Sequence, residues 1–222
     1  MEEVFYVLAI ILNMLPFSIM RYYPFRRVLR IPLHQLAALY TMILCAEIGC
    51  YLYHFHRFGG AAFFEQDSLL HVIFLCLYVV LSFAMIRESI YKQLYLWFTL
   101  ALYELAVFGI GIWTEDMLRV FLGLPRFLLL DSTVLLLLVC TWPLCRNLMQ
   151  RLQPFLQLKR PEMWRWSWVP GAAFFCMNML YAICSAHSLS SLVICRVLSL
   201  VSALFCLLLL LWTFVSRHQQ NI

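Results

Sequence analysis

The stretch RYYPFRRVLRIP, residues 21–32, decides how the chain folds, because it separates two long apolar runs. Its 12 positions hold four arginines, three aromatic residues and two prolines. A basic and aromatic segment of this kind has three readings: a nucleic-acid-binding patch, the flank of a cleaved targeting signal, or a loop between two membrane helices. The composition of the whole chain and the placement of its charges distinguish them.

The composition is that of a membrane protein. Of the 222 residues, 64% are hydrophobic and only 12% are charged, which is far from globular usage. A soluble chain cannot bury so much apolar surface, whereas a bilayer accepts it as solvent. We therefore predict a polytopic protein in contact with the lipid bilayer. The net charge of +5 does not require nucleic acid as a partner, because membrane proteins concentrate basic residues in cytoplasmic loops.

Seven apolar runs approach the length that crosses a hydrocarbon core of about 30 Å, which takes about 20 helical residues. The predicted spans are residues 4–20, 33–53, 69–86, 94–113, 125–144, 166–183 and 190–215. The fold class that follows is all-α, a bundle of seven transmembrane helices forming a single domain over residues 1–222. We find no internal repeat and no segment with the composition of a soluble domain.

Basic residues gather in alternate loops. Twelve of the 16 lysines and arginines follow the odd-numbered spans, while Arg57, Arg119 and Arg126 occupy the other loops. By the positive-inside rule the N-terminus is outside and the C-terminus is cytoplasmic. The first cytoplasmic loop then contains a basic anchor at the lipid headgroups, made of Arg21, Arg26, Arg27 and Arg30. No nucleic-acid site is expected.

The first apolar run does not have the pattern of a cleaved signal. A signal peptide begins with basic residues and ends at a site of small residues. Here Glu2 and Glu3 precede the run, the arginines follow it, and no such site is present. We therefore predict that the run is retained as a membrane span.

Five polar residues lie inside predicted spans and are the candidate site. They are Glu47, Glu104, Asp131, Asn178 and Arg196. Counted along the helices, all but Glu104 lie about 8–9 Å below the outer interface, and Glu104 is deeper. Ionisable groups inside a membrane normally face the bundle interior and pair, so we predict a shared polar core in which Arg196 pairs with Glu47 or Asp131. Three roles stay open: helix packing, a ligand- or signal-sensing site that opens outward, and proton movement.

Motifs of catalysis are missing from the sequence. It contains no phosphate-binding G-x-x-x-x-G-K-[ST], no zinc-binding H-E-x-x-H and no G-x-S-x-G. The nine cysteines form no C-x-x-C pair and we interpret them as packing residues. We expect no enzyme activity, no cofactor and no metal site.

The run FYVLAIILNMLPFSIMRYYPFRRVLRIP, residues 5–32, resembles the start of the membrane sensor regions of bacterial GHKL-type sensor histidine kinases. The resemblance rests on LPF at the end of the first span, RYYPFR after it and LRIP before the second. Up to about residue 215 it extends only to span number, loop length and polarity.

That resemblance implies a multi-pass sensor of the bacterial cytoplasmic membrane. Such a sensor binds a small-molecule or peptide ligand, forms a homodimer and signals through its last helix to a kinase domain and a response regulator. No kinase sequence is present in this chain, so we interpret it as a sensor module of a longer protein or as a kinase-less relative.

The leading hypothesis is thus a signal-sensing module whose polar core opens between outer loops at residues 54–68 and 114–125. The alternative is a small transporter or permease that uses Glu47, Glu104 and Asp131 as a coupling site within the membrane. A third possibility is a structural membrane subunit.

Overall fold

The computed structural model describes residues 2–58, 68–156, 161–184 and 189–219. Across these ranges the chain is helical, apart from short connections, and contains no strand. The elements are α1 (Glu2–Tyr22), η1 (Tyr23–Phe25), α2 (Leu33–Phe58), α4 (Ser68–Met85), α5 (Ile90–Leu122), α6 (Leu128–Leu156), α7 (Pro161–Ser167), α8 (Val169–Cys184) and α9 (Leu189–Gln219). The all-α prediction is confirmed.

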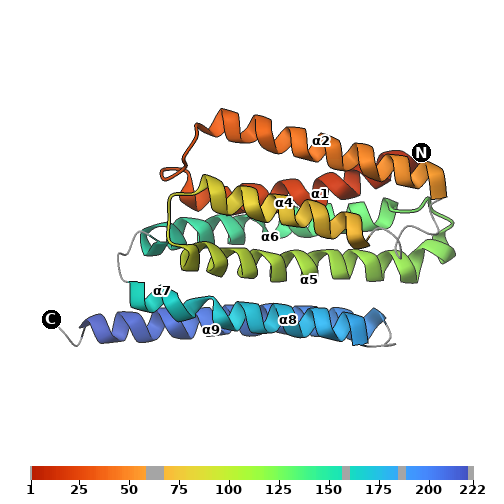
Figure 1. The fold of residues 1–222 in the computed structure, drawn as a ribbon. Coiled ribbons are helices and arrows are strands. Elements are labelled where there is room, and N and C mark those ends of the chain that lie inside the picture. Colours follow the sequence, from red (N-terminus) through yellow and green to blue (C-terminus); the bar gives the residue numbers. More distant parts are fainter. Residues whose placement is uncertain (1, 59–67, 157–160, 185–188, 220–222) are drawn as a thin grey trace.

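The helices run roughly along one axis, and α5 lies in the middle of the bundle (Figure 1). On one side α5 packs against α1 and α6, with α2 contacting α1 and α4 beyond them. On its other side it packs against α7 and the hairpin of α8 and α9. The central position of α5 means that both halves of the bundle share one helix.

Each of the seven predicted spans overlaps one helix, but α5 continues nine residues beyond the predicted end at residue 113, and α6 continues 12 residues beyond the predicted end at residue 144. Four described segments are long and apolar enough to cross a membrane: Glu2–Phe25, Leu33–Arg57, Ile90–Leu122 and Leu128–Gln153. Two shorter apolar segments are Ile73–Met85 and Ser190–Cys206. The chain therefore has the character of a membrane protein, while crossing by all seven helices stays a prediction.

The outer loops differ from the predicted ones. Residues 114–122 continue α5, so the prediction of a loop there is wrong; α5 ends at Gly123, whose φ of 62° is the left-handed conformation that terminates helices. Residues 54–58 likewise continue α2, and residues 59–67 lie outside the described ranges. The interval between α5 and α6 is thus a short turn.

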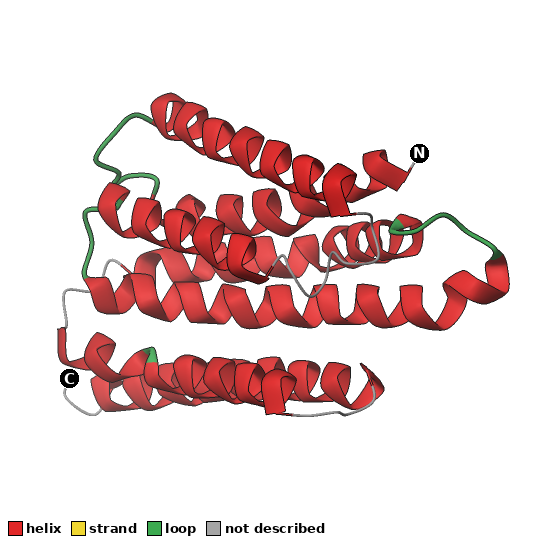
Figure 2. Ribbon diagram, turned by 45° about the vertical axis from the view of Figure 1, so that its right-hand side comes forward, coloured by secondary structure: helices red, strands yellow, loops and turns green. Residues whose placement is uncertain are grey.

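The loop that follows α1 is held against the connection between α4 and α5. Leu29 and Ile86 form an isolated antiparallel bridge, in which the Arg30 amide donates to the Met85 carbonyl oxygen at 2.9 Å. Figure 2 shows both loops, in green, at the same end of the bundle. The arginine-rich loop is therefore a fixed part of the fold at that end.

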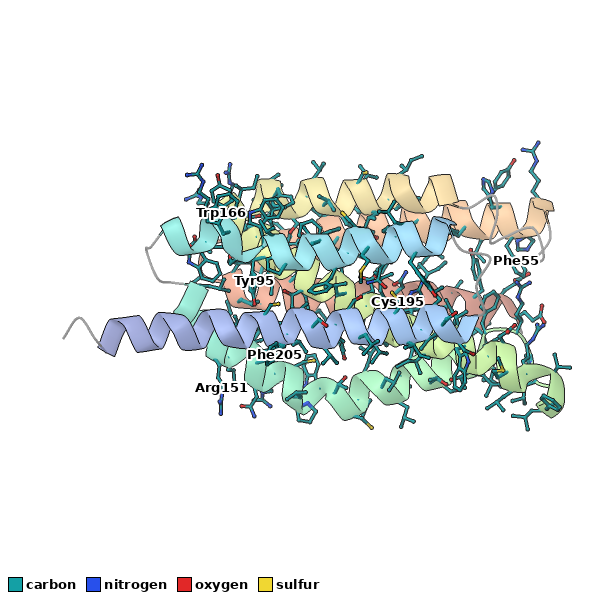
Figure 3. The ribbon with its side chains drawn as sticks, turned by 90° about the horizontal axis from the view of Figure 1, so that it is seen from below. Phe55, Tyr95, Arg151, Trp166, Cys195 and Phe205 are labelled. Atoms are coloured by element: carbon teal, nitrogen blue, oxygen red, sulfur yellow. The ribbon has the colours of Figure 1, made fainter. Side chains whose placement is uncertain are left out.

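Aromatic and basic side chains lie at both ends of the bundle. Arg151 and Trp166 lie toward one end and Phe55 lies at the other (Figure 3). At the first of these ends, Tyr95 of α5 packs edge-on against Trp164 of α7, with ring centres 5.7 Å apart. Aromatic and basic residues at a helix-bundle end are typical of a membrane–water interface.

Candidate functional site

The carboxylate of Glu47 in α2 is buried and hydrogen-bonded. Glu47 is only 1% exposed, and the Tyr78 hydroxyl of α4 donates to its Oε2 at 2.7 Å. The Tyr78 ring also packs against the ring of Tyr40, with centres 4.9 Å apart. Tyr40 precedes Glu47 by two helical turns, so both side chains project from one face of α2.

Tyr40 connects this pair to α1. Its hydroxyl donates to the Met14 carbonyl oxygen at 3.0 Å and accepts a hydrogen bond from the Ser18 hydroxyl. One hydroxyl therefore joins two turns of α1 to the face of α2 that bears Glu47. The Tyr40 hydroxyl therefore both donates and accepts a hydrogen bond, as a polar group in the interior requires.

Arg21, in the last turn of α1, also enters the bundle. Its guanidinium carbon lies 5.7 Å from the ring centre of Trp97 in α5, and its Nε is buried without a hydrogen-bond partner among the described residues. Its charge is attracted by Glu104 of α5. Glu104 in turn interacts electrostatically with Glu47. The Arg21 side chain points into the bundle because side chains tilt toward the N-terminus of their helix, and Arg21 lies in the last turn of α1.

We call this set the polar network; its members are Ser18, Arg21, Tyr40, Glu47, Tyr78 and Glu104. It lies among α1, α2, α4 and α5 and contains one guanidinium, two carboxyl groups and three hydroxyls. The three remaining arginines of the predicted cytoplasmic anchor, Arg26, Arg27 and Arg30, are exposed. Arg21 thus differs from them, because its side chain belongs to the interior.

Asp131 has other surroundings. It is 3% exposed, neither carboxylate oxygen has a hydrogen-bond partner in the described parts of the chain, and its electrostatic neighbour is Glu115. Glu115 accepts hydrogen bonds from the amides of Phe127 at 2.6 Å and Leu130 at 3.0 Å. These amides lie at the start of α6, so Glu115 supplies the cap that its first turn needs.

Arg196 and Asn178 belong to the α8–α9 side of the bundle. A Cβ placed on Gly109 of α5 would lie 2.9 Å from Cδ and 3.1 Å from a guanidinium nitrogen of Arg196. The Asn178 amide donates to the Phe174 carbonyl oxygen at 2.9 Å. Within the described ranges no ion pair joins Arg196 to an acid. Arg196 therefore packs closely on the backbone of α5.

The predicted polar core is thus only partly assembled. The structure places Glu104 within electrostatic range of Glu47, although no hydrogen bond joins them among the described residues, and it gives Asp131, Asn178 and Arg196 separate neighbours. Sequence reasoning missed Tyr40, Tyr78 and Ser18. The signal for Tyr40 was its spacing of seven from Glu47, and both tyrosines stand away from the span ends where interfacial tyrosines are expected.

The chemistry that the network offers is recognition of charge and hydrogen bonding in an apolar setting. A cationic ligand group could pair with Glu47 or Glu104, and an anionic ligand group could pair with Arg21. Among the described residues no group of three or more His, Cys, Asp and Glu side chains is arranged to hold a metal ion. No protein-family model, curated protein or solved structure matches this chain.

Proposed function

We propose that this chain is a membrane-embedded signal-sensing module. In this proposal the polar network binds an extracellular or membrane-borne ligand, and α9 transmits the resulting change toward the cytoplasm. The supporting observation is that α5 contacts both parts: Glu104 belongs to the network, and Gly109 lies against Arg196 of α9.

The geometry of α5 makes this transmission direct. Glu104 and Gly109 are five residues apart, which places them about 140° apart around the helix. One face of α5 therefore meets the network while another meets α9. Because the contact between Gly109 and Arg196 is close, and packed interfaces change between discrete arrangements, a rotation or shift of α5 displaces Arg196.

A ligand acts on this arrangement by binding one packing of the helices more tightly than the other. A charged ligand group that pairs with Arg21, Glu47 or Glu104 changes the balance of charges inside the network. Coupling energies between two sites of a protein are typically about 1–3 kcal/mol. That is sufficient for a signal, since it changes an equilibrium about 5- to 150-fold.

The orientation we propose has seven crossings, an outer N-terminus and a cytoplasmic C-terminus. Two observations support it: the start of α1 and the end of α9 lie at opposite ends of the bundle (Figure 1), and the exposed Arg26, Arg27 and Arg30 lie in the loop that follows α1. Residence in a bacterial cytoplasmic membrane, homodimerisation, and a GHKL-type kinase and response regulator as the output rest on the resemblance of residues 5–32.

A proton-coupled permease is the second candidate. The observation that favours it is the hydrogen bond between the Tyr78 hydroxyl and Glu47, together with the electrostatic proximity of Glu104. Acids and hydroxyls in series are the groups that relay protons within membranes. Asp131, the third acid of the predicted coupling site, interacts with Glu115 instead.

Two native cysteines provide a test of the sensor. Cys195 is partly buried beside Arg196 in α9, and Cys145 is a partly buried cysteine in α6. In protein reconstituted into nanodiscs, we expect Glu104→Gln to change the alkylation rate of Cys195 by N-ethylmaleimide severalfold, measured by peptide mass spectrometry. The rate at Cys145 should stay the same, because a partly buried cysteine would react faster if the variant were unfolded.

The exposed Glu2 gives a matched control, because Glu2→Gln removes the same charge outside the network. An unchanged rate at Cys195 in Glu104→Gln would argue against transmission through α5. Proton flux is measured in parallel with a pH-sensitive dye in proteoliposomes. Flux that is present in the wild type and lost in Glu47→Gln would overturn the sensor in favour of the permease.

A further inference from the structure

A pocket of about 610 Å³ lies where the loop after α1 meets the start of α5. Its charged lining consists of Arg30, Arg87, Lys92 and Glu88. Three of these four groups are cationic. The pocket is separate from the polar network, since none of its lining residues belongs to that network.

The backbone around the pocket is fixed by the antiparallel bridge between Leu29 and Ile86. In addition to the hydrogen bond from the Arg30 amide, the Arg87 amide donates to the Val28 carbonyl oxygen at 2.8 Å. The two arginines that line the pocket therefore project from segments held together by backbone hydrogen bonds. This backbone arrangement positions the side chains of Arg30 and Arg87 near each other without requiring a direct contact between the two guanidinium groups.

Lys92 and Glu88 neutralise each other. Lys92 is 6% exposed, and its Nζ donates to Glu88 Oε2 at 3.0 Å and to the Leu156 carbonyl oxygen. The Lys92 ammonium also lies 5.8 Å from the ring centre of Trp164. These contacts fix the position of Lys92, and its charge compensates that of Glu88, the one acid among the described residues that line this pocket.

Arg30 and Arg87 are left as the unneutralised charges of the pocket. Both are exposed, and neither forms a hydrogen bond through its side chain or an ion pair with any residue that the structure describes. The N-terminus of the 33-residue helix α5 adds positive potential at the same place. Planar guanidinium groups bind phosphate through two parallel hydrogen bonds, which makes phosphate the preferred partner.

We propose that this pocket binds the phosphate of an anionic phospholipid headgroup. The pocket lies at the bundle end that bears the exposed Arg26 and Arg27, where the proposed topology puts the cytoplasmic leaflet. Basic pockets between membrane helices on that side recognise anionic headgroups. Val28, the partly exposed apolar residue of the lining, suits the glycerol and first methylene groups of a lipid.

The test is lipid binding by the whole chain, purified in detergent and followed by native mass spectrometry with phosphatidylglycerol and phosphatidylcholine. We expect the wild type to retain phosphatidylglycerol and Arg30→Ala/Arg87→Ala to bind it about 10- to 30-fold more weakly, at about 1 kcal/mol for each arginine. Phosphatidylcholine should bind weakly to both. The conservative double variant Arg30→Lys/Arg87→Lys keeps the charge and loses the bidentate geometry. Its affinity for phosphatidylglycerol should lie between that of the wild type and that of Arg30→Ala/Arg87→Ala.

Arg26→Ala/Arg27→Ala is the matched control, since it removes the same charge from the same loop outside the pocket. Equal losses in the two double variants would overturn the proposal, because general surface charge would then explain binding. So would unchanged affinity in Arg30→Ala/Arg87→Ala. Inorganic phosphate is added as a competitor: if it binds the wild type and phosphatidylglycerol shows no preference over phosphatidylcholine, the pocket selects a soluble phosphate and the lipid assignment is wrong.

Discussion

Gly109 of α5 lies so close to Arg196 of α9 that a Cβ at Gly109 would approach the Arg196 Cδ to 2.9 Å. A charged side chain inside a bundle of apolar helices thus rests on the surface of a neighbouring helix at its smallest residue. Small residues at helix interfaces allow such close approach in membranes. The contact joins the C-terminal helix to the one that contains Glu104 of the polar network.

The substitution Gly109→Ala should loosen this contact. Overpacking of a tight interface costs about 1–3 kcal/mol, so we expect a lower free energy of unfolding in detergent, measured by SDS titration. Arg196→Ala in the same chain should remove most of the penalty, because the obstructing atoms are then absent. Gly49→Ala is the control, since a Cβ there meets nothing within 4 Å; an equal loss in both glycine variants would contradict the assigned contact.

Tyr78→Phe should destabilise the bundle by about 1–3 kcal/mol, because it leaves the buried Glu47 carboxylate without its donor. The measurement is again the free energy of unfolding. Tyr91→Phe removes an equivalent hydroxyl from an exposed side chain of α5 and should change stability by less than about 0.5 kcal/mol. Similar values for the two variants would mean that the Tyr78 hydroxyl does not support Glu47.

Glu115→Ala should weaken the start of α6. Its carboxylate accepts two amide hydrogen bonds, from Phe127 and Leu130, and losing a charged cap costs about 1–3 kcal/mol. Hydrogen exchange at residues 127–131 should rise in this variant. The neighbouring and exposed Asp116 provides the comparison; if Asp116→Ala raises exchange equally, the capping role is wrong.

The proposed orientation predicts the sides of the two termini. An epitope tag at the N-terminus should be digested by protease added to right-side-out membrane vesicles. A tag at the C-terminus should be digested only in inverted vesicles. Digestion of both tags in the same vesicles would require an even number of crossings and would contradict the seven-span topology.

Much of the helical layout follows from the sequence alone. Apolar runs such as residues 33–53 and 94–113 predict helices, because a membrane requires every backbone group to be paired within the segment. The ends are less predictable: residues 114–122 are polar enough to suggest a loop, yet they continue α5 until Gly123 permits a left-handed ending.

The candidate site is only partly predictable for a different reason. Glu47 and Glu104 stand out because charges are rare inside spans, but pairing depends on which helices are neighbours and how each is rotated. Arg21 illustrates the difficulty: its position beside Arg26 and Arg27 in the sequence predicts a headgroup contact, whereas its place in the last turn of α1 directs it inward. Arg196 has no acidic residue in its own helix with which the sequence could predict a pair. Its contact with Gly109 depends on how α5 and α9 pack, which the sequence does not reveal.

The claim that the polar network and α9 are coupled is tested most directly by a double-mutant cycle between Tyr78→Phe and Arg196→Ala. Substitutions at sites without shared partners normally add within about 0.3–0.5 kcal/mol. We predict an interaction energy of about 1 kcal/mol or more in the free energy of unfolding, because α5 transmits the loss of one contact to the other. Effects that add within about 0.5 kcal/mol would show that the network and α9 are independent and would contradict the proposed transmission.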